Sequence, residues 1–271
     1  MNKNIIYNED CIKGMEKIQT GIIDLILCDL PYGIIESGWD NELPITELWK
    51  QYNRIIKENG AIILTATQKF AAKLIEANKK YFRYDLVWKK NIPTGHANCN
   101  KMPLRQHELI LVFYKKAPTF NPQGLIPIPP KLKKRYKNGK FPVDSCYKEK
   151  TLSKPYIQKF SNYPKSVLEF SHDSMRVHPT QKPIALFEYL IKTYTNEGEL
   201  VLDNCMGSGT TAEACINTGR DYIGFETDVY YWKLCQRRIT RRLCKKDRID
   251  LHCLECICGA EDNGKVYCVV K

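Results

Sequence analysis

Short apolar runs alternate with longer amphipathic stretches along most of this chain. We predict buried strands at 4–7, 22–27, 61–65, 84–88, 109–114, 199–203 and 222–225. Apolar residues recur at helical spacing in the segments 44–58, 67–78, 183–195, 210–218 and 229–244. Continuous apolar runs are typical of strands buried on both faces of a sheet. The alternation therefore predicts an α/β protein with a doubly wound, mostly parallel sheet.

The composition is that of an ordinary soluble protein. The 271 residues, 43% hydrophobic and 27% charged, are enough for one large α/β domain or for a domain with a sizeable insertion. No apolar run approaches the roughly 20 residues that span a bilayer, and the first residues lack the apolar stretch of a signal peptide. Twelve scattered Cys favour a reducing compartment, so we expect a cytoplasmic protein without a membrane segment.

Positive charge is concentrated in one segment. The chain carries a net charge of +12, and residues 115–165 hold thirteen Lys or Arg against two acidic residues. Aromatic residues lie among these cations, which is unusual for a purely disordered tract. The mixture of cations and rings favours a nucleic-acid surface, with a solvated flexible loop as the alternative.

The segment Asp29-Leu30-Pro31-Tyr32 follows the predicted strand 22–27. Ligands bind at the carboxyl ends of strands in open α/β sheets. Pro31 restricts the backbone, so that the Leu30 carbonyl can lie beside the Asp29 carboxylate as a second acceptor. Two acceptors suit an amino group with two N–H donors, and the Tyr32 ring offers a face for a planar base. An ordinary strand-ending turn is the alternative.

A second motif lies near the other end of the chain. Asp203 ends a predicted strand, a turn with Gly207 and Gly209 follows, and Glu226 ends the next strand. Glycines let a backbone approach a ligand closely, and the acidic residue can bind ribose hydroxyls. A dinucleotide-dependent dehydrogenase is one interpretation. It explains neither the late position of this motif nor the Asp29 segment nor the basic insertion.

Three motifs together resemble one family. Asp29-Leu30-Pro31-Tyr32, the segment 178–183 (HPTQKP) and the segment 203–211 (DNCMGSGTT) are similar to the amino-group DNA methyltransferases that use S-adenosylmethionine. The order, with the catalytic motif first and the glycine turn last, resembles the β class. The resemblance covers about residues 4–114 and 172–243. It implies a Rossmann-like sheet in circularly permuted order, in which the strand before Asp10 lies beside the strand before Glu226.

The resemblance also implies roles for individual residues. Asp29, Leu30, Pro31 and Tyr32 would hold the flipped target base. Asp10 would bind the adenine amino group of the cofactor, and Glu226 would bind its ribose. Lys182 would face the carboxylate at the methionine end. The other residues near the methionine end would be His178, Asp203, Cys205, Gly207 and Gly209. The chain departs from the common family pattern at Leu30, where a Pro is usual, and at Asn204-Cys205, where Pro-Phe is usual.

The expected target is the exocyclic amine of adenine in double-stranded DNA. Asp at the first motif position favours adenine in this family, whereas the cytosine-N4 enzymes more often carry Ser. Cytosine-N4 methylation is therefore the first alternative, followed by RNA adenine methylation and by a catalytically silent DNA-binding relative. Carbon-5 methylation needs a Cys nucleophile, usually as Pro-Cys, and that pair does not occur in the chain.

These motifs divide the chain into four parts. We expect a catalytic half at 1–114, a basic target-recognition insertion at 115–171 that could begin near 91, a cofactor-binding half at 172–248 and a Cys-rich tail at 249–271. The cations expected to contact DNA phosphates are Lys131, Lys133, Lys134, Arg135 and Lys137. A homodimer is possible, and a restriction partner is not predictable. The tail residues Cys253, Cys256, Cys258 and Cys268 do not have the spacing of paired zinc ligands, so no metal site is predicted.

Overall fold

The computed structural model describes residues 1–33, 42–133, 156–173, 181–246, 261–262 and 265–266. The chain divides into two compact units. The larger, Met1–Asn121 with Ser166–Lys271, contains an eight-stranded sheet, and the smaller, Pro122–Lys165, contains a two-stranded sheet. No helix in the described ranges is long and apolar enough to cross a membrane.

The eight-stranded sheet is parallel over most of its width. Its strands lie in the order β1 (Ile5–Tyr7), β10 (Asp221–Phe225), β9 (Leu200–Asp203), β2 (Ile23–Asp29), β3 (Ile56–Ala66), β5 (Arg105–Phe113), β4 (Phe82–Thr94) and β8 (Val167–Glu169). The pairs from β1 to β3 are parallel, and β5 is antiparallel to both of its neighbours. The predicted α/β class and mostly parallel sheet are confirmed.

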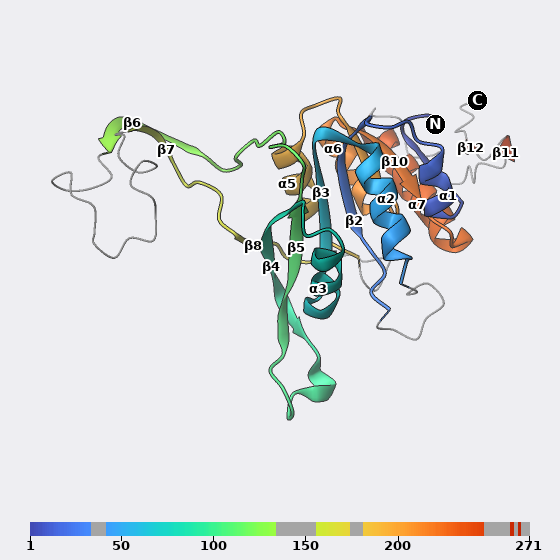
Figure 1. The fold of residues 1–271 in the computed structure, drawn as a ribbon, viewed down its shortest axis with the longest axis horizontal. Helices are drawn as coiled ribbons and strands as arrows, with labels where there is room; N and C mark the ends of the chain where they lie inside the picture. The colour runs from blue at the N-terminus through green and yellow to red at the C-terminus, as the bar shows by residue number, and fades with distance from the viewer. Residues whose placement is uncertain (34–41, 134–155, 174–180, 247–260, 263–264, 267–271) are drawn as a thin grey trace. The chain divides into compact units, whose positions relative to one another are not determined.

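Helices cover both faces of this sheet (Figure 1). Leu25 and Leu27 of β2 pack on one face in a core with α5 (Ile184–Tyr194), α6 (Thr210–Thr218) and α7 (Val229–Lys246). Ile26 and Cys28 pack on the other face in a core with α1 (Cys11–Glu16), α2 (Ile45–Ile55) and α3 (Gln68–Ala77). Successive residues of a strand point to opposite faces, so one apolar run supplies two cores. This is the doubly wound arrangement.

The first strand of the chain lies beside one of the last. β1 pairs in parallel with β10, with Ile5 opposite Ile223 and Tyr7 opposite Phe225. The segment after β1 therefore emerges at the same sheet edge as Glu226, which follows β10. The expected circularly permuted order is confirmed.

One predicted boundary is wrong. The helix expected at 44–58 ends at Ile55, and β3 begins at Ile56, which is buried and pairs with Ile23 of β2. Gly60 lies within β3, where an added Cβ would come within 2.8 Å of the Asp24 carbonyl oxygen. Pairing with β2 overrides the helical spacing of the apolar residues at this junction.

Two strands are longer than their apolar runs. The strand predicted at 84–88 continues to Thr94 as β4, and the strand predicted at 109–114 begins earlier, at Arg105, as β5. The two strands form a hairpin that extends beyond the other strands (Figure 1). A short 3₁₀ helix, η1 (His96–Asn98), lies in the connection between them. The extension consists mainly of exposed polar residues, so its sequence carries no burial pattern.

The smaller unit is a hairpin within the basic segment. β6 (Ile126–Lys133) and β7 (Tyr156–Ser161) are antiparallel, with Ile126 opposite Ser161. Neither strand was predicted, because the segment has prolines and cations in place of an alternating pattern. In the tail, β11 (Glu261–Asp262) pairs with β12 (Lys265–Val266). The four-part division of the chain stays a prediction.

Candidate active site

Acidic residues follow four parallel strands at one edge of the sheet. Asp29 ends β2 and Asp203 ends β9, while Asp10 and Glu226 come shortly after β1 and β10. Because parallel strands end at a common edge, residues from both ends of the sequence come together there. The fold thus joins the two motifs that lie more than 170 residues apart in the chain.

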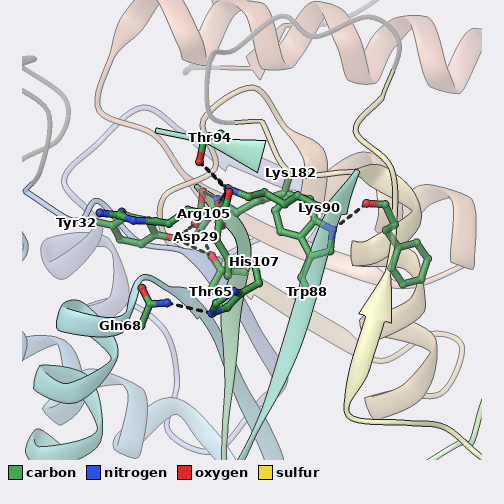
Figure 2. A network of polar contacts seen from close by, with 12 residues as sticks. Asp29, Tyr32, Thr65, Gln68, Trp88, Lys90, Thr94, Arg105, His107 and Lys182 are labelled. Carbon is green, nitrogen blue, oxygen red and sulfur yellow. Dashed lines mark hydrogen bonds and ion pairs between the residues drawn. The ribbon is translucent and has the colours of Figure 1, made fainter. Parts of the chain in front are cut away.

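The Asp29 carboxylate is held by three side-chain donors (Figure 2). Its Oδ1 accepts hydrogen bonds from the Tyr32 hydroxyl at 2.6 Å and from the Thr65 hydroxyl. Its Oδ2 accepts a hydrogen bond from Lys182 Nζ at 2.6 Å. A carboxylate offers about four acceptor positions, so the described donors leave one, on Oδ2. The orientation of this carboxylate is fixed before any substrate arrives.

Tyr32 lies beside Asp29 with its ring partly accessible. The ring centroid lies 5.3 Å from that of Phe70, and Lys182 Nζ lies 5.8 Å from the Tyr32 centroid. Burial and the nearby Asp29 charge raise the pKa of the Tyr32 hydroxyl, which therefore stays protonated as a donor. Leu30 is buried and Pro31 is half-buried. The placement of these four residues is compatible with the predicted base site, and their roles stay predictions.

Lys182 contacts the predicted catalytic residue in this structure. Its ammonium forms ion pairs with Asp29 at 2.6 Å and with Glu108 at 3.3 Å. Burial lowers the pKa of Lys182, but the two carboxylates outweigh burial and the net shift is upward. The side chain is therefore a permanent cation. The role that the resemblance implies, in which Lys182 faces the cofactor carboxylate, stays a prediction.

The glycine turn provides the second half of the site. Asp203 is buried and accepts hydrogen bonds from the Thr211 hydroxyl and from the Cys205 N–H at 3.0 Å. Burial raises the pKa of Asp203 to about 6. The Glu226 carboxylate accepts the N–H groups of Gly207 at 2.7 Å and of Asp228 at 2.9 Å. Burial also raises the pKa of Glu226.

The two predicted glycines differ in what surrounds them. Gly207 has a φ of +54°, and no atom lies within 4 Å of the position that a Cβ would occupy. Gly209 has a φ of +88°, and its Cβ would overlap the sulfur of Cys235 on α7. Gly207 thus leaves open space at the turn, where a ligand can approach the backbone. Gly209 allows the turn to pack closely against α7.

The departure at Asn204-Cys205 is accommodated by local polar contacts. Asn204 accepts a hydrogen bond from the Tyr52 hydroxyl, and its amide nitrogen lies 3.5 Å from the Cys11 sulfur and 3.4 Å from the Cys205 sulfur. The main cause that raises the pKa of Cys205 is its hydrogen bond with Cys11. Cys205 is therefore a neutral thiol at the base of the turn.

The other predicted site residues are only partly described. Asp10 caps α1 by accepting the Lys13 N–H at 3.0 Å, so its cofactor role stays a prediction. Lys131 and Lys133 are exposed on β6. His178, Lys134, Arg135, Lys137 and the four tail cysteines lie outside the described residues. The described ranges contain no cluster of acidic, His or Cys side chains that could hold a metal.

Sequence reasoning missed three members of the polar network. Thr65 lies opposite Asp29 on the neighbouring strand β3. Its signal in the sequence is that it is a polar residue at the end of the predicted strand 61–65. Glu108 lies on β5 and Lys90 on β4, two strands that were predicted without a functional residue. No local pattern in the sequence distinguishes the buried Lys90 and the half-buried Glu108 from surface charges.

The Asp29 segment and the glycine turn thus lie at one edge of a doubly wound α/β sheet. The sequence matches the profile of the DNA methylase family over residues 23–237, and the chain belongs to this family. It is therefore a DNA methyltransferase, and the dehydrogenase interpretation is wrong.

Named relatives match most of this chain. The chain is 27% identical to type II methyltransferase M.HpaI of Haemophilus parainfluenzae, across 94% of this chain and 80% of the relative. It is 28% identical to the DNA adenine methyltransferase YhdJ of Escherichia coli (strain K12), across 88% and 82%.

Solved structures show the same fold. The M1.HpyAVI–SAM complex is similar with a TM-score of 0.58 and 26% identity, across 86% of this chain and 98% of that one. The cytosine-N4-specific PvuII DNA methyltransferase has a TM-score of 0.62 at 16% identity, across 89% and 92%, a likeness of fold alone.

Proposed function

We propose that the chain transfers a methyl group from S-adenosylmethionine to the exocyclic N6 amine of adenine at a specific site in double-stranded DNA. The observation that carries this proposal is the Asp29 carboxylate, which two hydroxyls and one ammonium orient while one acceptor position stays available. An aromatic amine is a weak nucleophile because its lone pair is delocalised into the ring. Asp29 and the Leu30 carbonyl accept its two N–H groups and so favour the geometry in which the lone pair can attack.

The glycine turn fits the proposed cofactor. The open space at Gly207 admits a ligand next to the backbone, and Glu226 can exchange its backbone partners for ribose hydroxyls. When bound, S-adenosylmethionine supplies a methyl group on a positively charged sulfur, which leaves as a neutral thioether. Asp203 and Glu226 add acidic character to this edge of the sheet, as a cationic ligand requires. M1.HpyAVI, a protein of the same fold, was solved with SAM.

Adenine is favoured over cytosine by two observations. Asp29 occupies the motif position at which adenine-specific members of the family carry Asp, and the relative YhdJ is named as a DNA adenine methyltransferase. The experiment is to express the chain in a host without DNA methylation and to digest the DNA to nucleosides. Mass spectrometry should then find N6-methyladenine. N4-methylcytosine alone would show that the alternative target is the correct one.

The basic hairpin is the proposed DNA-recognition insertion. Lys131 and Lys133 are exposed on β6, next to the cations at 134, 135 and 137. Phosphate contacts position a protein on DNA without reading sequence. Each lost contact should reduce the slope of log affinity against log salt by about 0.9. Replacing Lys131 and Lys133 with Ala should flatten this slope and leave the methylated site unchanged, whereas Lys79→Ala, on an exposed turn, is the control.

We also propose a cellular location and partners for this enzyme. The six described cysteines form no disulfide, which supports a reducing, cytoplasmic location. A homodimer and a restriction partner would agree with the type II methyltransferases among the relatives. Sedimentation of the purified chain and methylome sequencing of the expressing cells test these two points directly.

A further inference from the structure

Four charged side chains form a continuous series behind the target-base position, and Figure 2 labels three of them, Asp29, Lys182 and Lys90. Asp29 pairs with Lys182 at 2.6 Å, Lys182 pairs with Glu108 at 3.3 Å, and Glu108 pairs with Lys90 at 3.3 Å. The signs alternate along the series, from the negative charge at Asp29 to the positive charge at Lys90. β2, the segment before α5, β5 and β4 contribute one residue each.

Most of this series is removed from water. The whole residues Lys90 and Lys182 are 5% and 6% exposed, and the Glu108 side chain is 18% exposed. Burial raises the pKa of Glu108, but Lys182 and Lys90 outweigh burial and the net shift is downward. The Glu108 Oε2 atom is buried, and its contact within the series is the 3.3 Å ion pair with Lys182. Buried charges are costly without partners, and here each charge depends on the next.

We propose that Glu108 and Lys90 are positioning residues for methyl transfer, which act on Asp29 through Lys182. This inference rests on the proposed function. Glu108 shares the positive charge of Lys182, so that Lys182 orients Asp29 without cancelling its negative charge. Lys90 in turn balances Glu108, and Thr94 Oγ1 lies 3.3 Å from its ammonium.

The order of the charges gives the series a direction. Its negative end is Asp29, where the attacking amine develops positive charge as its lone pair forms the bond to the methyl group. Fixed charges in a water-poor site act strongly on such a developing charge, because they need no reorganisation at the moment of reaction. Without Glu108, the whole charge of Lys182 would act on Asp29 and make it a weaker acceptor. The pair of Glu108 and Lys90 therefore keeps Asp29 both oriented and negative.

The test compares Glu108→Gln with the double variant Lys90→Met/Glu108→Gln. Glu108→Gln leaves two buried cations with one carboxylate, so it should slow methyl transfer and also lower the melting temperature. The double variant removes one charge of each sign and should recover the melting temperature but not the rate. The matched control is Lys89→Met/Glu169→Gln. It removes an exposed ion pair of 3.0 Å, and Lys89 is the neighbour of Lys90 on β4. It should leave both quantities unchanged.

The rate is measured in single turnover with labelled S-adenosylmethionine and unmethylated genomic DNA, and cofactor affinity is measured by calorimetry. Glu108→Gln should slow transfer by about tenfold to a hundredfold, the range found when a residue that orients a metal ligand is removed. Cofactor affinity should stay within about twofold.

Three results would overturn the inference. If the double variant recovers the rate together with the melting temperature, Glu108 is only structural. If Glu108→Gln loses rate in proportion to cofactor affinity, Lys182 serves the cofactor. If Glu108→Gln keeps the wild-type rate, the series has no role in transfer. An inactive wild-type protein would instead overturn the proposed function, and the inference with it.

Discussion

Two acidic sites lie at the same sheet edge and are built in different ways. At the glycine turn, Asp203 and Glu226 accept N–H groups of Cys205, Gly207 and Asp228, at most nineteen residues away in the sequence. At the Asp29 site, the carboxylate is held by Tyr32 nearby, but also by Thr65 and Lys182, which are 36 and 153 residues away. The first site is largely local and the second depends on the assembled sheet.

This difference agrees with the two tasks. A turn that binds a cofactor needs backbone donors and open space, which a short segment with glycines supplies. A carboxylate that acts on a weak nucleophile needs an exact orientation and a defined charge, which only side chains converging from several elements provide. Substitutions at the two sites should therefore separate chemistry from cofactor binding.

The largest effect is expected for Asp29→Ala. It removes the carboxylate that accepts the target amine, so methyl transfer should fall by on the order of a hundredfold to a thousandfold. Affinity for S-adenosylmethionine should change little, because the glycine turn keeps its local contacts. Single-turnover rates and calorimetric titration measure the two quantities. Near-normal turnover in this variant would remove Asp29 from the mechanism.

Gly207→Val should act in the opposite way. The new side chain fills the open space at the turn, so cofactor binding should weaken by at least about tenfold, or 1.4 kcal/mol. The φ of +54° also makes any side chain strained there. Gly21→Val is the matched control, because Gly21 has a φ of +68° with open space around it but lies away from the site. Equal cofactor affinity in both variants would place the cofactor elsewhere.

Tyr32→Ala should affect capture of the flipped base. Stacking on an aromatic side chain contributes roughly 1–3 kcal/mol per base. Extrusion of a fluorescent adenine analogue from duplex DNA should therefore decrease in Tyr32→Ala and persist in Tyr32→Phe, which keeps the ring. Tyr32→Phe should still slow transfer, since it loses the 2.6 Å hydrogen bond to Asp29. An unchanged fluorescence signal in Tyr32→Ala would exclude stacking on this ring.

The same contrast explains what the sequence could predict. Strands with continuous apolar runs, the helix at 210–218 and the permuted order were all predictable, because burial and glycine turns leave local patterns. The helix end at Ile55 was not, since the choice of strand at Ile56 is made by pairing with Ile23.

The site follows the same rule. Asp29, Asp203, Gly207 and Glu226 were predictable as strand-end and turn residues. Glu108 and Lys90 were not, because a buried charge looks like a surface charge until its partner is known. The contact between Lys182 and Asp29 joins segments 153 residues apart, which the motif alone could not reveal.

The smallest net effect is expected for Asp203→Asn, and it concerns stability. The pKa of Asp203 is raised from 3.8 to about 6 by burial, so its contribution to folding is full below pH 4 and is lost as the pH rises through about 6. At about 1.4 kcal/mol per pKa unit, this shift lowers the free energy of unfolding at pH 7 by about 3 kcal/mol. Asp203→Asn removes the charge and so removes this destabilisation. The weaker hydrogen bonds of an amide to Thr211 and Cys205 offset much of it.

We therefore expect Asp203→Asn to be more stable than wild type by on the order of 1 kcal/mol at pH 7 and to lose this advantage toward pH 4. Urea unfolding at several pH values measures the difference. Asp221→Asn is the control with opposite sign, because hydrogen bonds from Lys3 and Asn4 lower the pKa of Asp221. That variant should be less stable than wild type at pH 7. If the stability difference between Asp203→Asn and wild type does not change with pH, burial does not raise the pKa of Asp203. The two acidic sites would then differ only in the donors that hold their carboxylates.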